Sequence, residues 1–404
     1  MKLGIVINVY VAADKNVYHT FDHPTYLDEF EKVETLSHTI QSINALEAIE
    51  EDVKLYLFGI DVSKATANDA IIEAKINKIV ETSKYPYEII TNSHIAGNQK
   101  KYDSDFYSVE NYSTIRNQGF LYAAEDDMDY VIQIDDDEIL RESYLVTLRA
   151  LLCQHSDKSI FTAPYEKNGT VMITTKDDLK SWEKFSSMNK DMTKLMSDPT
   201  IKESIFGFGG NMIIHKDVFE TMFHPEDVTR GEDFSFLLAT RLLYENGNAL
   251  TATNKHDARY RSFFVPDQAL TIIHKPPYEA KKEYLFYLEK NLTRFIYDWG
   301  RFKSQSHLDS QGLESLSFYM SKMIDHHNMK DKVGEILEEL SARHDNKKLN
   351  ELRDKLYLII DQVSQENLYD KFARRQKEYT DLVKTIKAAS NNPSKENRAS
   401  DTTQ

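Results

Sequence analysis

The spacing of apolar residues divides the first 278 residues of the chain into expected strands and helices. Short apolar runs rich in β-branched residues are typical of buried strands, and they occur at 2–11, 53–61, 87–93, 130–134, 159–165 and 269–277. Longer segments with apolar residues at helical spacing lie between them, at 26–49, 67–83, 112–127, 142–155 and 230–247. Strands that alternate with helices predict an α/β fold, with a mostly parallel sheet flanked by helices.

The pattern changes beyond about residue 280. Residues 279–388 are amphipathic and lack strand signals, which predicts an α-helical C-terminal region. The polar residues 389–404 are expected to form a disordered tail. Residues 176–204 are polar and charged, and we interpret them as a mobile lid or an insertion. Ser113 is the expected cap of the helix at 112–127. Gly247 is the expected stop signal of the helix at 230–247.

Composition limits the partners that the protein is expected to bind and the cellular compartment in which it is expected to act. A formal net charge of −15 disfavours nonspecific binding to phosphate backbones, so no nucleic-acid partner is expected. The single cysteine, Cys153, cannot form an internal disulfide, and its apolar helical setting predicts a buried structural thiol. No apolar run reaches transmembrane length, and the run at 2–11 resembles a strand more than a signal segment. A cytoplasmic protein is the expectation.

Residues 130–140, YVIQIDDDEIL, place four carboxylates directly after an expected core strand. Ligands of such sheets bind beyond the carboxyl ends of the strands. Because residues i and i+2 point to the same side, Asp135 and Asp137 can act together while Asp136 faces away. Carboxylate oxygens with substrate phosphates suit Mg²⁺ or Mn²⁺. A solvated helix cap is a second interpretation. The third, a calcium loop, would need the alternating EF-hand spacing, which is absent.

Two blocks of the chain carry motifs in a specific order. Residues 113–138, STIRNQGFLYAAEDDMDYVIQIDDDE, contain R-N-x-G, a strand and D-x-D, and residues 206–247 contain a glycine-bearing strand, G-E-D, R-L and a glycine. Together they resemble the GT-A glycosyltransferases, particularly glycosyltransferase family 2. The resemblance covers roughly residues 1–278. It implies a GT-A domain with a nucleotide-sugar half at 1–140 and an acceptor half at 141–278.

The resemblance also implies roles for the acidic residues. Asp135 and Asp137 would hold a divalent cation, Mn²⁺ or Mg²⁺, and His274 would be either the third ligand or a structural histidine. Asp233 would be the base that takes the proton of an acceptor hydroxyl, with Glu232 beside it. Adjacent carboxylates at one helix start cannot both face one point, so Glu232 would orient a loop or the acceptor.

Other residues are expected to bind the donor nucleotide. The expected set is Asn8, Tyr10, Asp61, Arg116, Asn117, Asp135, Asp136 and Lys275. Asp61 would contact uracil or ribose, or else be an ordinary turn aspartate. Arg116 would pair with the diphosphate or with an aspartate of the cluster. Lys255, Arg259 and Arg261 would either clamp phosphate from a closing loop or lie on a solvated one.

The implied activity is metal-dependent transfer of a sugar from a nucleoside-diphosphate sugar, UDP rather than GDP, to a hydroxyl of a saccharide or other acceptor. The G-E-D match favours inversion, and the absence of Q-x-x-R-W favours a non-processive enzyme of bacterial-type glycan or glycoconjugate synthesis. Three alternatives stay open: a retaining transferase, a sugar-phosphate nucleotidyltransferase, and a non-catalytic sugar-binding or scaffold protein. The C-terminal helices could form a homo-oligomer or contact a membrane surface.

Overall fold

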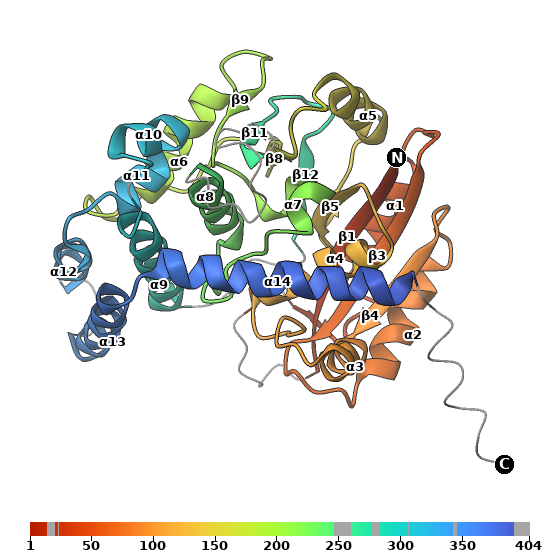
Figure 1. Cartoon of the computed structure of the whole chain (residues 1–404), viewed down its shortest axis with the longest axis horizontal. Coiled ribbons are helices and arrows are strands. Elements are labelled where there is room, and N and C mark those ends of the chain that lie inside the picture. The colour runs from red at the N-terminus through yellow and green to blue at the C-terminus, as the bar shows by residue number, and fades with distance from the viewer. Residues whose placement is uncertain are drawn as a thin grey trace.

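The computed structural model describes residues 1–13, 21–22, 24–245, 260–276, 283–305, 307–341 and 346–391. Within them, one large sheet has the strand order β4–β3–β1–β5–β10–β7–β11–β9, with β2 paired to β1 (Figure 1). The bounds are β1 Lys2–Ala12, β2 Thr25–Tyr26, β3 Asp52–Asp61, β4 Tyr87–Thr91, β5 Tyr130–Asp135, β7 Ile160–Thr162, β9 Lys202–Glu203, β10 Met212–His215 and β11 Ser262–Phe264. β1, β3, β4 and β5 are parallel, whereas β10 runs antiparallel to both of its neighbours.

The central strand β1 explains why both faces of the sheet are covered. Its odd-numbered residues from Leu3 to Val11 belong to one apolar core, whereas Val6 and Tyr10 belong to the other. Because successive side chains of a strand point to opposite faces, a continuous apolar run requires a helical layer on each side. The run therefore folds as a strand that is buried on both faces.

Helices from the first half of the chain cover the two faces. Leu36, Ile72 and Leu148 bring α1, α2 and α5 into the core that contains Leu3, and α4 packs in the other core through Phe120. The bounds are α1 Thr35–Asn44, α2 Asp69–Val80, α3 Asn92–Tyr102, α4 Tyr112–Glu125, α5 Tyr144–Gln154, α7 Lys216–Phe219 and α8 Glu232–Glu245.

The C-terminal residues are helical and pack on the sheet domain. α14 runs along α4, as Figure 1 shows, and its Tyr379 hydroxyl donates to the Phe219 carbonyl at 2.8 Å. α6 from the middle of the chain joins these helices, because Asp191 accepts backbone N–H groups of Phe318 and Tyr319 in α11. The bounds are α6 Lys184–Leu195, α9 Tyr284–Lys303, α10 Ser310–Leu316, α11 Phe318–Ile324, α12 Met329–Ser341, α13 Asn346–Gln365 and α14 Leu368–Ser390.

A second, small sheet joins three distant segments. It has the order β6–β12–β8, with bounds β6 Glu138–Ile139, β8 Tyr165–Glu166 and β12 Ile272–His274. β12 pairs antiparallel with β6, and the register sets His274 opposite Glu138. This pairing carries the C-terminal end of β12 to the end of β5, where the acidic cluster begins.

The predicted fold class is confirmed: a mostly parallel sheet lies between helices and is followed by an α-helical C-terminal region. Several local predictions are wrong. The helix expected at 26–49 is only α1, since residues 27–32 form turns and residues 45–49 are not helical, and α3 was not predicted. The cap of α4 is Asn111, whose side chain accepts the Thr114 N–H at 3.1 Å, rather than Ser113. Cys153 is exposed, because it lies on the outer face of α5.

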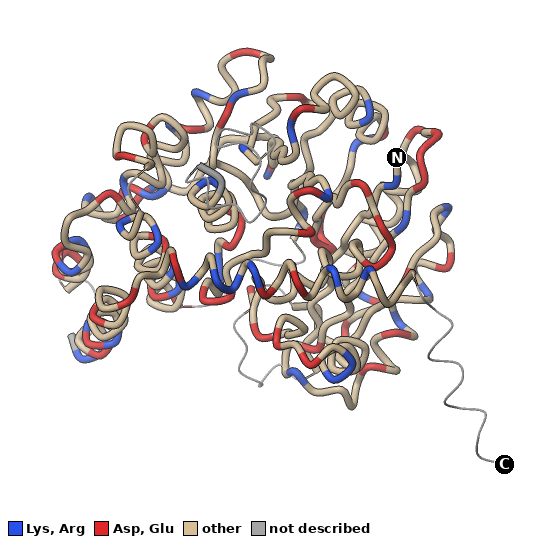
Figure 2. The backbone as a smooth tube through the Cα atoms, viewed as in Figure 1, with Lys and Arg blue, Asp and Glu red and all other residues tan. Residues whose placement is uncertain are grey.

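Other predictions fall partly outside the described residues. Residues 389 and 390 extend α14, whereas 392–404, Gly247, Lys255 and Arg259 lie outside them. Part of the expected lid at 176–204 forms α6. Across the described ranges no helix combines the length and apolar character needed to cross a bilayer. Lys and Arg alternate with Asp and Glu along the C-terminal helices (Figure 2).

Candidate active site

A cavity of about 410 Å³ opens at the carboxyl ends of β1 and β5. Strand pairing sets Asn8 of β1 opposite Asp135 of β5, and the Asn8 amide donates to Asp135 at 3.5 Å. Tyr10, two residues further along β1, lines the cavity with its ring stacked on Phe21 at 4.9 Å. The cavity therefore lies where a parallel sheet is expected to bind its ligands.

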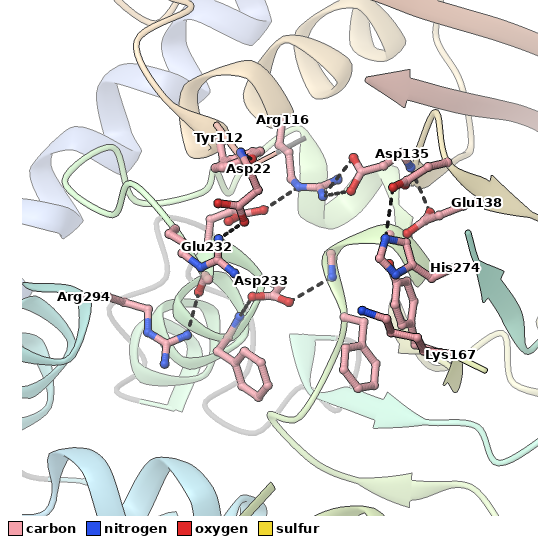
Figure 3. A pocket seen from close by; sticks show the side chains of 18 of the residues that line it. Asp22, Tyr112, Arg116, Asp135, Glu138, Lys167, Glu232, Asp233, His274 and Arg294 are labelled. Atoms are coloured by element: carbon pink, nitrogen blue, oxygen red, sulfur yellow. Dashed lines mark hydrogen bonds and ion pairs between the residues drawn. The ribbon is translucent and has the colours of Figure 1, made fainter. Parts of the chain in front are cut away.

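Arg116 of α4 links two acidic segments that are distant in sequence. Its Nη2 donates to both carboxylate oxygens of Asp135, at 3.0 and 3.2 Å, and its Nε donates to Glu232 at 2.7 Å (Figure 3). The guanidinium is 3% exposed, so both ion pairs are shielded from solvent. Arg116 holds the pKa of Glu232 below its ordinary value against the effect of burial. The predicted pairing of Arg116 with an aspartate of the cluster is confirmed.

A second contact of the acidic cluster joins the Asp137 carboxylate to the His274 imidazole. His274 Nε2 lies 3.0 Å from Asp137 Oδ2, and the Lys275 N–H donates to the Asp137 carbonyl at 2.8 Å. The imidazole packs beside the ring of Tyr165, with the ring centres 4.9 Å apart. β12 thus brings His274 to the acidic cluster from a point more than 130 residues away in sequence.

Glu138 is the fourth carboxylate of the cluster. It is fully buried, and its Oε2 accepts the Asp135 N–H at 2.8 Å. Burial, followed by the charges of Asp135 and Asp137, raises its pKa well above the ordinary value. A Cβ atom at Gly210 would lie 1.6 Å from Glu138 Oε1, so only glycine leaves space for this carboxylate. Asp136 also lines the cavity, and burial raises its pKa, with Asp137 as the next cause.

Asp233 and Glu232 begin α8 and turn to different partners. Glu232 binds Arg116, whereas Asp233 accepts the backbone N–H groups of Gly209 and Phe234, both at 2.9 Å. Burial and then the charge of Glu232 raise the pKa of Asp233 to about 6. A carboxylate with that pKa is a competent proton acceptor near neutral pH.

The fit of the cluster to a divalent cation is partial. In the described part of the chain, no group of three or more His, Cys, Asp or Glu side chains is placed to hold a metal ion. Both oxygens of Asp135 face Arg116. The Asp137 carboxylate and the His274 imidazole, whose Nδ1 has no partner among the described residues, fit two ligands of a cation that takes its other ligands from substrate and water.

Five predicted site residues lie outside the cavity lining, and Asn8 of β1 is one of them. Asn117 exchanges two hydrogen bonds with the backbone of His224, at 2.7 and 3.0 Å. Asp61 is fully buried and accepts from Ser63 and Asn68, both at 2.8 Å. Lys275 is exposed, and Arg261 pairs with Glu203. The side chains of Asn117, Asp61 and Arg261 therefore serve local structure.

The cavity also contains charged residues that sequence reasoning did not single out: Asp22, Lys167, Lys184, Arg230 and Arg294. One signal was available for Arg294. The helix at 284–303 has polar residues at positions 291, 294, 298 and 301, which follow helical spacing, and all four are buried. A polar stripe between apolar neighbours indicates a buried network rather than a solvated face.

Comparisons with known proteins give distant similarities. No family model and no curated protein matches the sequence. The chain is similar in structure to TarS of S. aureus, with 11% identity, a TM-score of 0.43, and 96% of this chain and 55% of that chain covered. It is also similar to the mannosyltransferase PcManGT from Pyrobaculum calidifontis in complex with GDP-Man and Mn²⁺, with 9% identity, a TM-score of 0.46, and 96% and 86% coverage.

Proposed function

We propose that this chain is a glycosyltransferase that moves a sugar from a nucleoside-diphosphate sugar to an acceptor hydroxyl, with a divalent cation as cofactor. The observation that carries the proposal is the cavity itself. It contains a carboxylate–imidazole pair, Asp137 and His274, and a separate carboxylate, Asp233, whose pKa lies near neutrality. Transfer to a hydroxyl needs one group to neutralise a leaving diphosphate and another to accept a proton.

Asp137 and His274 are the proposed holders of Mn²⁺ or Mg²⁺. When bound, such a cation offsets the negative charge that grows on the departing nucleoside diphosphate. Asp135 supports this site through Arg116 rather than as a ligand, because that guanidinium engages both of its oxygens. Tyr10 is a proposed donor contact, because it lines the cavity and its hydroxyl has no partner among the described residues, whereas Asn8 is outside the lining and donates to Asp135.

Asp233 is the proposed base. The two N–H groups that it accepts aim its carboxylate at the cavity, and its raised pKa gives it a stronger affinity for a proton than an exposed aspartate has. Glu232 acts on it from the adjacent position: its negative charge raises the pKa of Asp233, while Arg116 keeps Glu232 itself ionised. Direct attack of the deprotonated hydroxyl on the anomeric carbon would invert its configuration.

A donor screen tests the proposal. The protein would be titrated with UDP- and GDP-sugars, with and without Mn²⁺, and its unfolding temperature and release of nucleoside diphosphate would be recorded. We expect one donor to stabilise the protein only with the cation and to be slowly hydrolysed or transferred. Stabilisation without turnover would favour a sugar-binding protein, and no effect of any donor would reject the proposal. The same panel tests the predicted preference for UDP over GDP.

A further inference from the structure

The end of the cavity opposite the acidic cluster is lined by cations. Lys184 comes from α6, Arg230 from the segment before α8, and Arg294 from α9. Figure 3 shows Arg294 and His274 on opposite sides of Asp233. The cavity therefore has an acidic end, made by Asp135–Glu138, and a basic end, made by Lys184, Arg230 and Arg294.

Two of these cations have no carboxylate partner. Arg230 forms an ion pair with Asp22. Among the described residues, however, neither Lys184 nor Arg294 has a carboxylate within ion-pair distance. Lys184 Nζ donates to the Asn291 side-chain oxygen at 3.1 Å, and Arg294 donates to the Tyr319 hydroxyl at 2.6 Å. These acceptors are neutral, so neither cation makes an ion pair, and carboxylates such as Asp233 act on both only from beyond ion-pair distance.

Burial makes this arrangement costly without a ligand. Arg294 is 3% exposed, and its Nε has no hydrogen-bond partner in the described part of the chain. Burial, followed by the charge of Arg294, lowers the pKa of Lys184 to about 7. A buried charge is normally paired, because an unpaired one loses its hydration without compensation. An anion between Lys184 and Arg294 would supply the missing partner to both.

A purely structural role accounts for only part of the basic end. Arg294 Nη1 lies 3.4 Å from the carbonyl of Gly231, whose φ of +71° makes the turn into α8, so the guanidinium braces that turn. A brace does not require a second cation beside it. Lys184 reaches the cavity from α6, and its hydrogen bond to Asn291 would be made equally well by a neutral donor.

We propose that Lys184 and Arg294 bind an anionic group, phosphate or carboxylate, on the acceptor substrate. This inference rests on the proposed transferase function, which assigns the donor diphosphate to the cation site at the acidic end. Gly231, which Arg294 contacts, immediately precedes Glu232 and Asp233. The anionic group therefore lies close in the acceptor to the hydroxyl that loses its proton to Asp233, and neutral acceptors of the same shape bind more weakly.

The test uses inorganic phosphate as the probe, with the protein freed of divalent cations. Calorimetry would measure phosphate binding to the wild type, K184Q, K184R and K190Q. Glutamine keeps a donor for Asn291 but removes the charge, so K184Q should bind phosphate about ten-fold more weakly, since a charge-assisted hydrogen bond is lost. K184R should restore binding. K190Q is the matched control, because Lys190 is an exposed lysine of the same helix.

Two further arms separate this inference from the proposed function. D137A should lose cation-dependent donor binding while its phosphate affinity stays unchanged, and K184Q should show the reverse. Equal phosphate binding by wild type and K184Q, or no phosphate binding by the wild type, would overturn the inference and leave the donor site standing. Replacing phosphate by acetate distinguishes the two anions: tighter binding of acetate would assign a carboxylate, and tighter binding of phosphate a phosphorylated acceptor.

Discussion

The acidic and basic ends of the cavity are built in different ways. The acidic end is one stretch of chain, Asp135–Glu138, at the end of a strand whose register with β1 fixes it in place. The basic end is assembled from α6, the turn before α8, and α9, which are separated by tens of residues in sequence. Backbone pairing positions the first end, whereas side-chain packing between helices positions the second.

This difference has an energetic counterpart. At the acidic end, like charges are crowded, and burial raises the pKa values of Asp135, Asp136 and Glu138. At the basic end, burial lowers the pKa of Lys184. Burial thus disfavours the charged form of Lys184 at one end and of these three carboxyl groups at the other. Ligands of opposite sign, a cation at one end and an anion at the other, would relieve both penalties.

The largest expected effect concerns the acidic end alone. D137A removes one of the two proposed cation ligands, and we expect cation-dependent donor binding to be lost and transfer to fall by roughly 100-fold or more. Calorimetry with the donor, with and without Mn²⁺, measures the effect. D157N, which changes an exposed aspartate on the surface, is the control. Unchanged donor affinity in D137A would place the cation elsewhere.

Asp233 lies between the two ends, and its substitution should lower the rate of transfer without changing donor affinity. D233N removes the proposed base, so transfer should fall by about 10²–10⁴-fold while donor affinity is retained. In the wild type, the rate should fall as pH decreases through about 6, because the raised pKa of Asp233 then places a proton on the base. In E232Q this acid limb should move to lower pH, since the charge that raises the pKa of Asp233 is gone. A limb that stays in place would exclude Asp233 as the titrating group.

A smaller effect is expected from the glycine against the acidic end. G210A would set a Cβ atom into the Glu138 carboxylate, and we expect the free energy of unfolding to fall by about 1–3 kcal/mol. G97A is the matched control, because nothing lies within 4 Å of the atom that it adds to α3. It should be neutral or stabilising by up to about 1 kcal/mol. Denaturant unfolding compares the two, and equal stability would show that Glu138 can move aside.

The smallest expected effect concerns an ion pair between α14 and the segment that leads to α8. Arg375 of α14 donates to both oxygens of Glu226, at 2.9 and 3.1 Å, in the segment that leads to α8. R375A should lower the free energy of unfolding by about 1 kcal/mol, as expected for a partly exposed ion pair. K384A, which removes an exposed pair on the same helix, should change it by less than about 0.5 kcal/mol. A loss of several kcal/mol would show that α14 is required for the sheet domain to fold.

Sequence patterns predicted the sheet side of the molecule well. β1, β3 and β5 follow their apolar runs because a strand buried on both faces needs a continuous one. The strand-end argument pointed to Asp135 and Asp137, whereas Asp233 was implied by the family resemblance, and all three line one cavity. Helix ends were less predictable: residues 27–32 have helical spacing but form turns, because tertiary contacts can override local propensity.

The basic end was not predicted, for a physical reason. Lys184 lies in a polar segment with no strand register, and only its packing on α11 through Asp191 brings it to the cavity. Asp61 and Asn117 illustrate the converse. Both were expected to bind the donor nucleotide. Asp61 is instead a turn aspartate that accepts from Ser63 and Asn68, the alternative left open for it, and Asn117 pairs with the distant backbone of His224. Hydrogen-bond partners more than 100 residues apart cannot be read from local pattern.

The buried polar stripe of α9 has an evolutionary consequence. Arg294 contacts the carbonyl of Gly231, and Arg301 pairs with Asp227, so one helix grips both ends of the segment that leads to the proposed base. Substitutions on the cavity side of α6 would then alter acceptor recognition, while these contacts of α9 keep the proposed base in place relative to the donor side. In the proposed transferase, the architecture would permit acceptors to diversify while the donor side stays unchanged, with α9 as the fixed joint between them.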